Sequence, residues 1–199
     1  IYKANVGTLR FRQIYVNDVP AIRARTPNEG TYYRIQQWDN ANKRIIVNAS
    51  EISNWARLNE VELIAFTHFT QENLRIASFS GTDGSVSFLE PDASNTFLKA
   101  SWYRDPNQAY FFENAYEFLD APGEFYLNTG TNELFYKPRA GEDMASVVIF
   151  TPKLERIVQL QGTPSAYSHN IQFYGITFEH STWMQPSSQG YADWYGGFS

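Results

Sequence analysis

The stretch from residue 113 to residue 138 constrains the fold of this chain more than any other part of the sequence. Two short aromatic runs, Glu124–Leu127 and Glu133–Tyr136, flank a polar loop that contains a glycine. Alternating apolar residues on both sides of such a loop predict a β-hairpin. Just upstream, Pro122 and Gly123 predict a tight turn, because proline presets its own φ and glycine supplies a positive φ.

Short strands separated by turn residues continue through most of the chain. Asp83-Gly84 is a further hairpin signal, and residues 1–26 contain two or three strands. The other predicted strands are Tyr32–Gln37, Arg44–Val47, Glu60–His68, Asn73–Phe79, Ser85–Leu89 and Val147–Phe150. Residues 91–107 are the longest polar linker. Many short strands with little helical periodicity predict an all-β fold, with an antiparallel β-sandwich-like domain over residues 1–152.

The pattern changes from residue 153 onward. Two apolar runs, Ile157–Leu160 and Ile171–Phe178, are separated by glycine and asparagine, which is typical of the coils of a parallel solenoid. At least about three repeats are needed to bury a continuous solenoid core, and the remaining residues are too few for three. We therefore expect residues 153–199 to be the first coils of a parallel solenoid that is cut short.

The composition excludes several classes of function. The net charge is −5 and no run of Lys or Arg occurs, so the sequence predicts no nucleic acid partner. No apolar run is long enough to cross a membrane. The absence of cysteine excludes disulfides and thiolate metal sites, and it fits a secreted or periplasmic protein as well as a cytosolic one. Aromatic residues make up 17% of the chain, which suits either an aromatic core or surfaces for stacking on sugars.

Charged residues offer several candidate pairs. Arginines at positions 10, 12, 23 and 25 fall at strand spacing. Such arginines usually pair with carboxylates at the rim of a sandwich, and the sharper alternative is a clamp for a substrate carboxylate. Asp120 and Glu124 flank the Pro-Gly turn, where an aspartate commonly accepts hydrogen bonds from backbone N–H groups. His68 has no second ligand at a metal-binding spacing, so we expect neither a metal nor a cofactor.

The carboxyl-terminal stretch holds the candidate binding residues. Four aromatics could stack on sugar rings, and two polar side chains could bind hydroxyl groups. These residues are Trp183, Gln185, Tyr191, Asp193, Trp194 and Tyr195. For Trp183 the alternative is structural, because its ring could instead seal the end of the first coil against the sandwich.

Three stretches resemble a known group of enzymes. The run LDAPGEFYL and the following NELFYKP are similar to secreted right-handed parallel β-helix glycoside hydrolases of the β-xylosidase and α-L-fucosidase type. Arg12–Pro27 resembles the first strands of that group, and Ile171–Pro186 resembles its first coil. The resemblance implies that residues 153–199 begin a right-handed parallel β-helix. It also implies that the catalytic carboxylates lie on later coils, beyond Ser199.

The function expected from this resemblance is hydrolysis of a plant or microbial polysaccharide. The chain would act as part of a larger enzyme, outside the cytoplasm of a bacterium, and would be inactive alone. Its partners would be an oligo- or polysaccharide and the later coils of the same polypeptide. A non-catalytic carbohydrate-binding or adhesin-like module remains an alternative, as does a polysaccharide lyase on the same solenoid.

Overall fold

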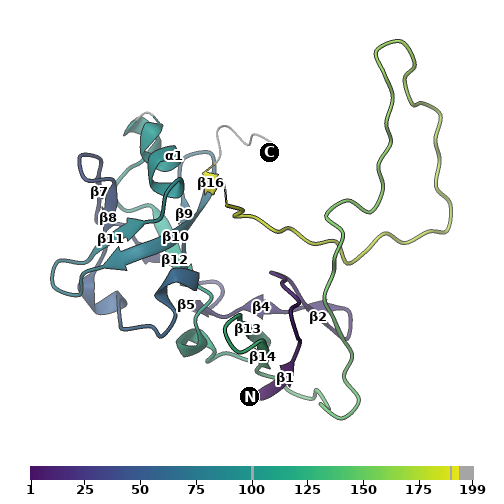
Figure 1. Ribbon diagram of the computed structural model, residues 1–199, viewed down its shortest axis with the longest axis horizontal. Coiled ribbons are helices and arrows are strands. Elements are labelled where there is room, and N and C mark those ends of the chain that lie inside the picture. The colour runs from purple at the N-terminus through teal and green to yellow at the C-terminus, as the bar shows by residue number, and fades with distance from the viewer. Residues whose placement is uncertain (100, 189, 193–199) are drawn as a thin grey trace.

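The computed structural model describes residues 1–99, 101–188 and 190–192. Over these residues the secondary structure is mostly β-strand, with one short α-helix and four turns of 3-10 helix. Figure 1 shows two groups of strands and a long loop that projects away from both. None of the helices in the described part has the length and hydropathy needed to cross a bilayer.

The larger group of strands is a nine-stranded antiparallel sheet. Its order is β5-β12-β9-β10-β11-β8-β7, with β6 pairing with β12 and β16 pairing with β10. The strands are β5 (Arg25–Thr26), β6 (Tyr33–Arg34), β7 (Gln37–Asp39), β8 (Arg44–Ile46), β9 (Glu62–Phe66), β10 (Gln71–Phe79), β11 (Ser85–Phe88), β12 (Ala109–Glu113) and β16 (Tyr191–Ala192). The sheet buries the larger core, which includes Trp55, Leu63, Leu74 and Phe112.

The smaller group contains two further sheets. A four-stranded sheet has the order β1-β14-β13-β4, in which only the β4–β13 pairing is parallel, and a three-stranded sheet has the order β15-β2-β3. The strands are β1 (Tyr2–Asn5), β2 (Tyr15–Val16), β3 (Val19–Pro20), β4 (Ile22–Arg23), β13 (Glu124–Asn128), β14 (Glu133–Tyr136) and β15 (Ile149–Phe150). These strands enclose a second, smaller core.

Strand β13 belongs to both cores because successive side chains of a strand point to opposite faces. Phe125 and Leu127 lie in the smaller core, whereas Tyr126 lies in the larger one. The predicted hairpin is confirmed as β13 paired with β14, and Gly123 has the predicted positive φ of 88°. The strands form the all-β, largely antiparallel arrangement that the turn spacing predicted.

The prediction of a linker over residues 91–107 is wrong. Helix α1 (Asp92–Leu98) forms there, and η3 (Ser101–Tyr103) follows. The carboxylate of Asp92 is fully buried and accepts hydrogen bonds from the Arg75 guanidinium at 2.8 and 2.9 Å, which ties the helix to β10. The other 3-10 turns are η1 (Ala49–Glu51), η2 (Leu58–Glu60) and η4 (Tyr116–Phe118).

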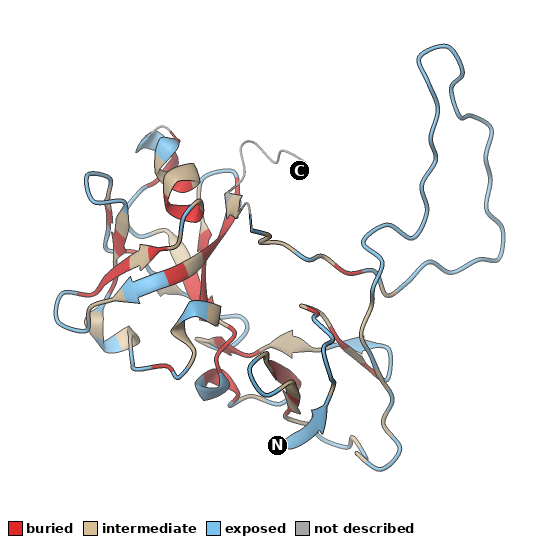
Figure 2. Ribbon diagram, in the orientation of Figure 1, coloured by how far each residue is buried: buried red, intermediate tan, exposed pale blue. Residues whose placement is uncertain are grey.

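Residues 151–182 form the projecting loop. The described backbone has no helix or strand there, and apart from an isolated bridge between Thr163 and Ala166 the loop is extended. Figure 2 colours almost all of it as exposed. The predicted solenoid coils are therefore not shown among the described residues. The physical reason is that a parallel coil pairs with the coils before and after it, and no described segment lies in that position.

Candidate functional site

The chain returns from the projecting loop to the larger sheet at residues 182–192. Gln13 holds this return through both ends of its amide. Its Oε1 accepts hydrogen bonds from Thr182 Oγ1 at 2.6 Å and from the Trp183 backbone N–H at 3.0 Å. Its Nε2 donates to the Trp183 carbonyl at 3.1 Å. The position of the Trp183 backbone is thus set by a residue near the amino terminus.

Two aromatic side chains meet at this return. The rings of Trp183 and Tyr191 pack edge to face, with their centroids 4.8 Å apart. Tyr191 is held by the pairing of β16 with β10, opposite Asn73. The Arg12 guanidinium lies 5.8 Å from the centroid of the Trp183 ring, a distance at which a cation attracts an aromatic face. Trp183 is half-buried, so part of its surface remains open to solvent.

Arg12 belongs to a group of four charged residues that we call the ionic tetrad: Arg12, Arg23, Glu62 and Glu113. Arg12 donates to both oxygens of Glu62 at 2.5 and 2.6 Å and also to Glu113 at 3.1 Å. Arg23 donates to Glu113 at 2.6 Å and to Glu62 at 3.1 Å. All four side chains are at most 14% exposed. The predicted pairing of arginines with carboxylates is confirmed for Arg12 and Arg23, in the interior rather than at a rim. It is wrong for the other two, because Arg10 and Arg25 donate to carbonyl oxygens instead.

The two arginines of the tetrad hold the Glu62 carboxylate ionised. Burial disfavours the charged form of Glu62, but the Arg23 and Arg12 guanidinium groups outweigh this effect and hold the pKa of Glu62 below its ordinary value. A general acid in glycoside hydrolysis needs a raised pKa so that it carries a proton at neutral pH. The arrangement therefore suits positioning of Arg12 under Trp183, not proton transfer to a leaving group.

Glu124 is the described carboxylate whose environment comes nearest to that of a general acid. Burial is the main cause that raises its pKa, and three backbone hydrogen bonds oppose it. Those bonds come from the N–H groups of Arg25, Asp120 and Ala121 at 2.9–3.3 Å. Glu124, and not Asp120 as the turn chemistry predicted, is thus the residue that caps the Pro-Gly turn. Both carboxylate oxygens of Glu124 therefore accept hydrogen bonds from backbone N–H groups.

The other predicted binding residues do not join the aromatic pair in the described structure. Gln185 Oε1 accepts a hydrogen bond from the Ser187 backbone N–H at 2.7 Å, so this side chain stabilises its own turn. Asp193, Trp194 and Tyr195 lie outside the described residues. His68 pairs with Asp105 at 2.5 Å, and no group of three potential metal ligands occurs in the described part of the chain.

Sequence reasoning missed Gln13 and the placement of Arg12. Both belong to the RQIYV run, whose resemblance to a known group was noted, but nothing near them in the sequence indicates that they contact Trp183.

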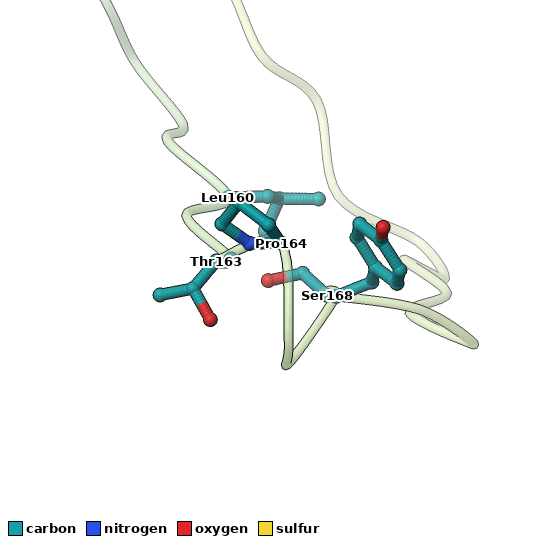
Figure 3. A pocket seen from close by; sticks show the side chains of 6 residues that line it. Leu160, Thr163, Pro164 and Ser168 are labelled. Atoms are coloured by element: carbon teal, nitrogen blue, oxygen red, sulfur yellow. The ribbon is translucent and has the colours of Figure 1, made fainter.

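A separate hollow of about 500 Å³ lies inside the bend of the projecting loop, where Figure 3 shows Leu160, Thr163, Pro164 and Ser168. It is lined by residues of that bend and contains none of the predicted site residues.

Comparison with known proteins gives two findings. Residues 1–139 match the family model of the GH141 insertion domain. A solved structure named glycoside hydrolase is similar to this chain, with a TM-score of 0.84 and 29% sequence identity. The similarity covers 96% of this chain and 35% of that chain, so this chain spans well under half the length of its structural relative. None of the curated proteins matches this chain.

Proposed function

The chain belongs to the GH141 insertion domain family, and from that membership we propose that it is the part of a glycoside hydrolase that supports one wall of the substrate cleft. In this proposal residues 1–150 are a rigid accessory domain and Trp183 and Tyr191 lie at the sugar-binding surface. The substrate is a plant or microbial polysaccharide, which the enzyme meets outside the cytoplasm because such a polymer is too large to enter a cell.

The observation that carries the proposal is the aromatic pair at the return of the chain. Aromatic rings bind the C–H face of a pyranose through contact area and dispersion. The Trp183 ring is oriented by Arg12 on one side and Tyr191 on another, and its backbone is clamped by Gln13. A ring held in this way loses little conformational freedom when a sugar stacks on it, which favours binding.

We further propose that residues 153–199 begin a right-handed parallel β-helix in the whole enzyme, in which further coils cover residues 153–182. Support comes from their apolar side chains, which are 40–59% exposed at Ile157, Val158, Leu160, Ile171, Phe173, Ile176 and Phe178. An exposed apolar surface of this extent marks an interaction site. Coils of the same polypeptide would cover these side chains and would supply the catalytic carboxylate pair, since the carboxylates of the ionic tetrad are engaged by arginines.

The test is steady-state kinetics of Trp183→Ala in the intact enzyme, with an aryl β-xyloside and an aryl α-L-fucoside as substrates. Losing a stacking surface weakens the ground state and transition state alike, so KM should rise about threefold to tenfold while kcat changes little. Trp102→Ala is the matched control, because Trp102 is 53% exposed in a different aromatic cluster. A lowered melting temperature with an unchanged KM would assign Trp183 to a structural seal.

A further inference from the structure

A second hollow, of about 340 Å³, lies between η4 and the β13–β14 hairpin. It shares no lining residue with the Trp183 return. Its wall consists of three aromatic side chains. Tyr116 packs edge to face against Phe135 at 5.1 Å and against Tyr126 at 6.1 Å, and the rings of Tyr126 and Phe135 are stacked with centroids 6.3 Å apart. Tyr116 is 46% exposed, so its ring presents an aromatic surface to the hollow, with the partly buried Phe135 beside it.

The Tyr126 hydroxyl is the most informative polar group of this hollow. The residue is only 2% exposed, but its hydroxyl is not one of the fully buried polar atoms that lack a partner in the described part of the chain, so the oxygen reaches the surface of the hollow. A polar group at such a surface is hydrogen-bonded to water until a ligand replaces that water. Burial, together with the nearby Glu60 carboxylate, raises the pKa of Tyr126 to about 12, so the hydroxyl keeps its proton and is a donor. A bound ligand or a water molecule would satisfy it.

Three further polar side chains line the hollow, and each has a polar atom that makes no hydrogen bond to the described residues. The Arg57 guanidinium donates hydrogen bonds from Nε and Nη2 to the Glu60 carboxylate, at 2.8 and 2.5 Å. Asn128 Oδ1 accepts from the loop backbone, and Glu117 Oε1 accepts from the Ala56 N–H at 2.9 Å. Among the described residues this leaves Arg57 Nη1, Asn128 Nδ2 and Glu117 Oε2 without a protein partner. The hollow therefore offers donors and an acceptor around an aromatic wall.

We propose that this hollow is a binding subsite for a neutral pyranose. A pyranose has an apolar C–H face that fits the Tyr116 and Phe135 rings, and hydroxyl groups at its edge that both donate and accept hydrogen bonds. An acidic sugar is disfavoured, because Glu60 already neutralises Arg57 and because Glu117 would repel a carboxylate. This inference does not depend on the role proposed for Trp183.

The surroundings of Glu117 suit a ligand longer than one sugar. Glu117 also lines a neighbouring hollow of about 260 Å³, together with Ser50, Glu51 and Ser53. Besides these polar side chains, the second hollow is lined by Trp55 and Phe118, whose rings are buried. If one sugar ring of a polysaccharide stacks on Tyr116, the next sugar along the chain lies near the polar side chains of this second hollow and can form hydrogen bonds with them.

The test is saturation-transfer difference NMR on the intact protein. The probes are the methyl glycosides of xylose, glucose, galactose and fucose, with methyl glucuronide as the acidic comparison. We expect transfer to the ring C–H protons of at least one neutral probe and none to the glucuronide. The dissociation constant should increase about tenfold in Tyr116→Ala and about fivefold in Tyr126→Phe, which removes only the hydroxyl. Melting temperatures of both variants show whether the fold is retained.

Two controls separate this subsite from other aromatic surfaces. Tyr32→Ala removes a tyrosine that is 42% exposed and packs on Phe66, away from the hollow, and it should leave binding unchanged. The Tyr116→Ala comparison is repeated in a Trp183→Ala background, where it should give the same fold-change if the hollow binds sugar independently of the aromatic pair. The proposal is overturned if no neutral probe shows transfer, if only the glucuronide binds, or if a folded Tyr116→Ala or Tyr126→Phe variant binds as tightly as the unaltered protein.

Discussion

The strand-rich part of the chain, up to Phe150, and the projecting loop of residues 151–182 have similar apolar side chains but opposite burial. Phe112 of β12 is fully buried between neighbouring strands, whereas Phe173 of the loop is 49% exposed. Phe112 also sits on a backbone paired on both sides, by β5 and by β9. The difference shows that an apolar run becomes a strand only where another segment satisfies its backbone hydrogen bonds.

The largest expected effect comes from truncating these two phenylalanines. Phe112→Ala should lower the free energy of unfolding by about 3–5 kcal/mol, because it leaves a cavity in a packed core. Phe173→Ala should change it by no more than about 0.5 kcal/mol, as is usual for exposed positions. Denaturant unfolding of both variants measures the difference. Equal losses would mean that the loop packs against the strand-rich part in solution, and the comparison would fail.

Charged residues sharpen the comparison between buried and exposed surroundings. Glu62→Gln should destabilise the protein by about 3 kcal/mol or more, because it leaves the guanidinium groups of Arg12 and Arg23 partly uncompensated in the interior. The matched control is Glu133→Gln, which breaks an exposed ion pair with Lys3 and should change the free energy of unfolding far less, because water screens exposed charges. If the two variants unfold at the same denaturant concentration, the ion pair between Arg23 of β4 and Glu62 of β9 does not stabilise the fold as its burial predicts.

A smaller effect is expected from pH. The folded pKa of Glu62 lies below its ordinary value of 4.5, so the stability that this group contributes is complete above that value. It is lost as pH falls through the folded pKa, because the folded protein must then take up a proton that breaks the ion pairs. Unfolding measured between pH 7 and pH 3 should show a shallower decline in Glu62→Gln than in the unaltered protein. A parallel decline would exclude this linkage.

Local sequence predicted the elements that short stretches of chain can build alone. The β13–β14 hairpin, the positive φ of Gly123 and the strands β9, β10 and β11 all follow from alternation and turn chemistry. Helix α1 did not follow, because its polar residues carry no helical pattern. Its position depends on Asp92 bonding to Arg75 and on Thr96 bonding to Glu72, both on a strand formed earlier in the chain.

The candidate site divides in the same way. Its aromatic residues Trp183 and Tyr191 were predicted, because aromatic content can be read directly from the chain. The clamp by Gln13, the placement of Arg12 and the capping by Glu124 were decided only in the tertiary structure. Hydrogen bonds and ion pairs gain most where water is excluded, and which groups lose water together depends on how distant strands pack. The sequence alone therefore determined the turns, the strands and the aromatic residues, and the packing decided which side chains meet.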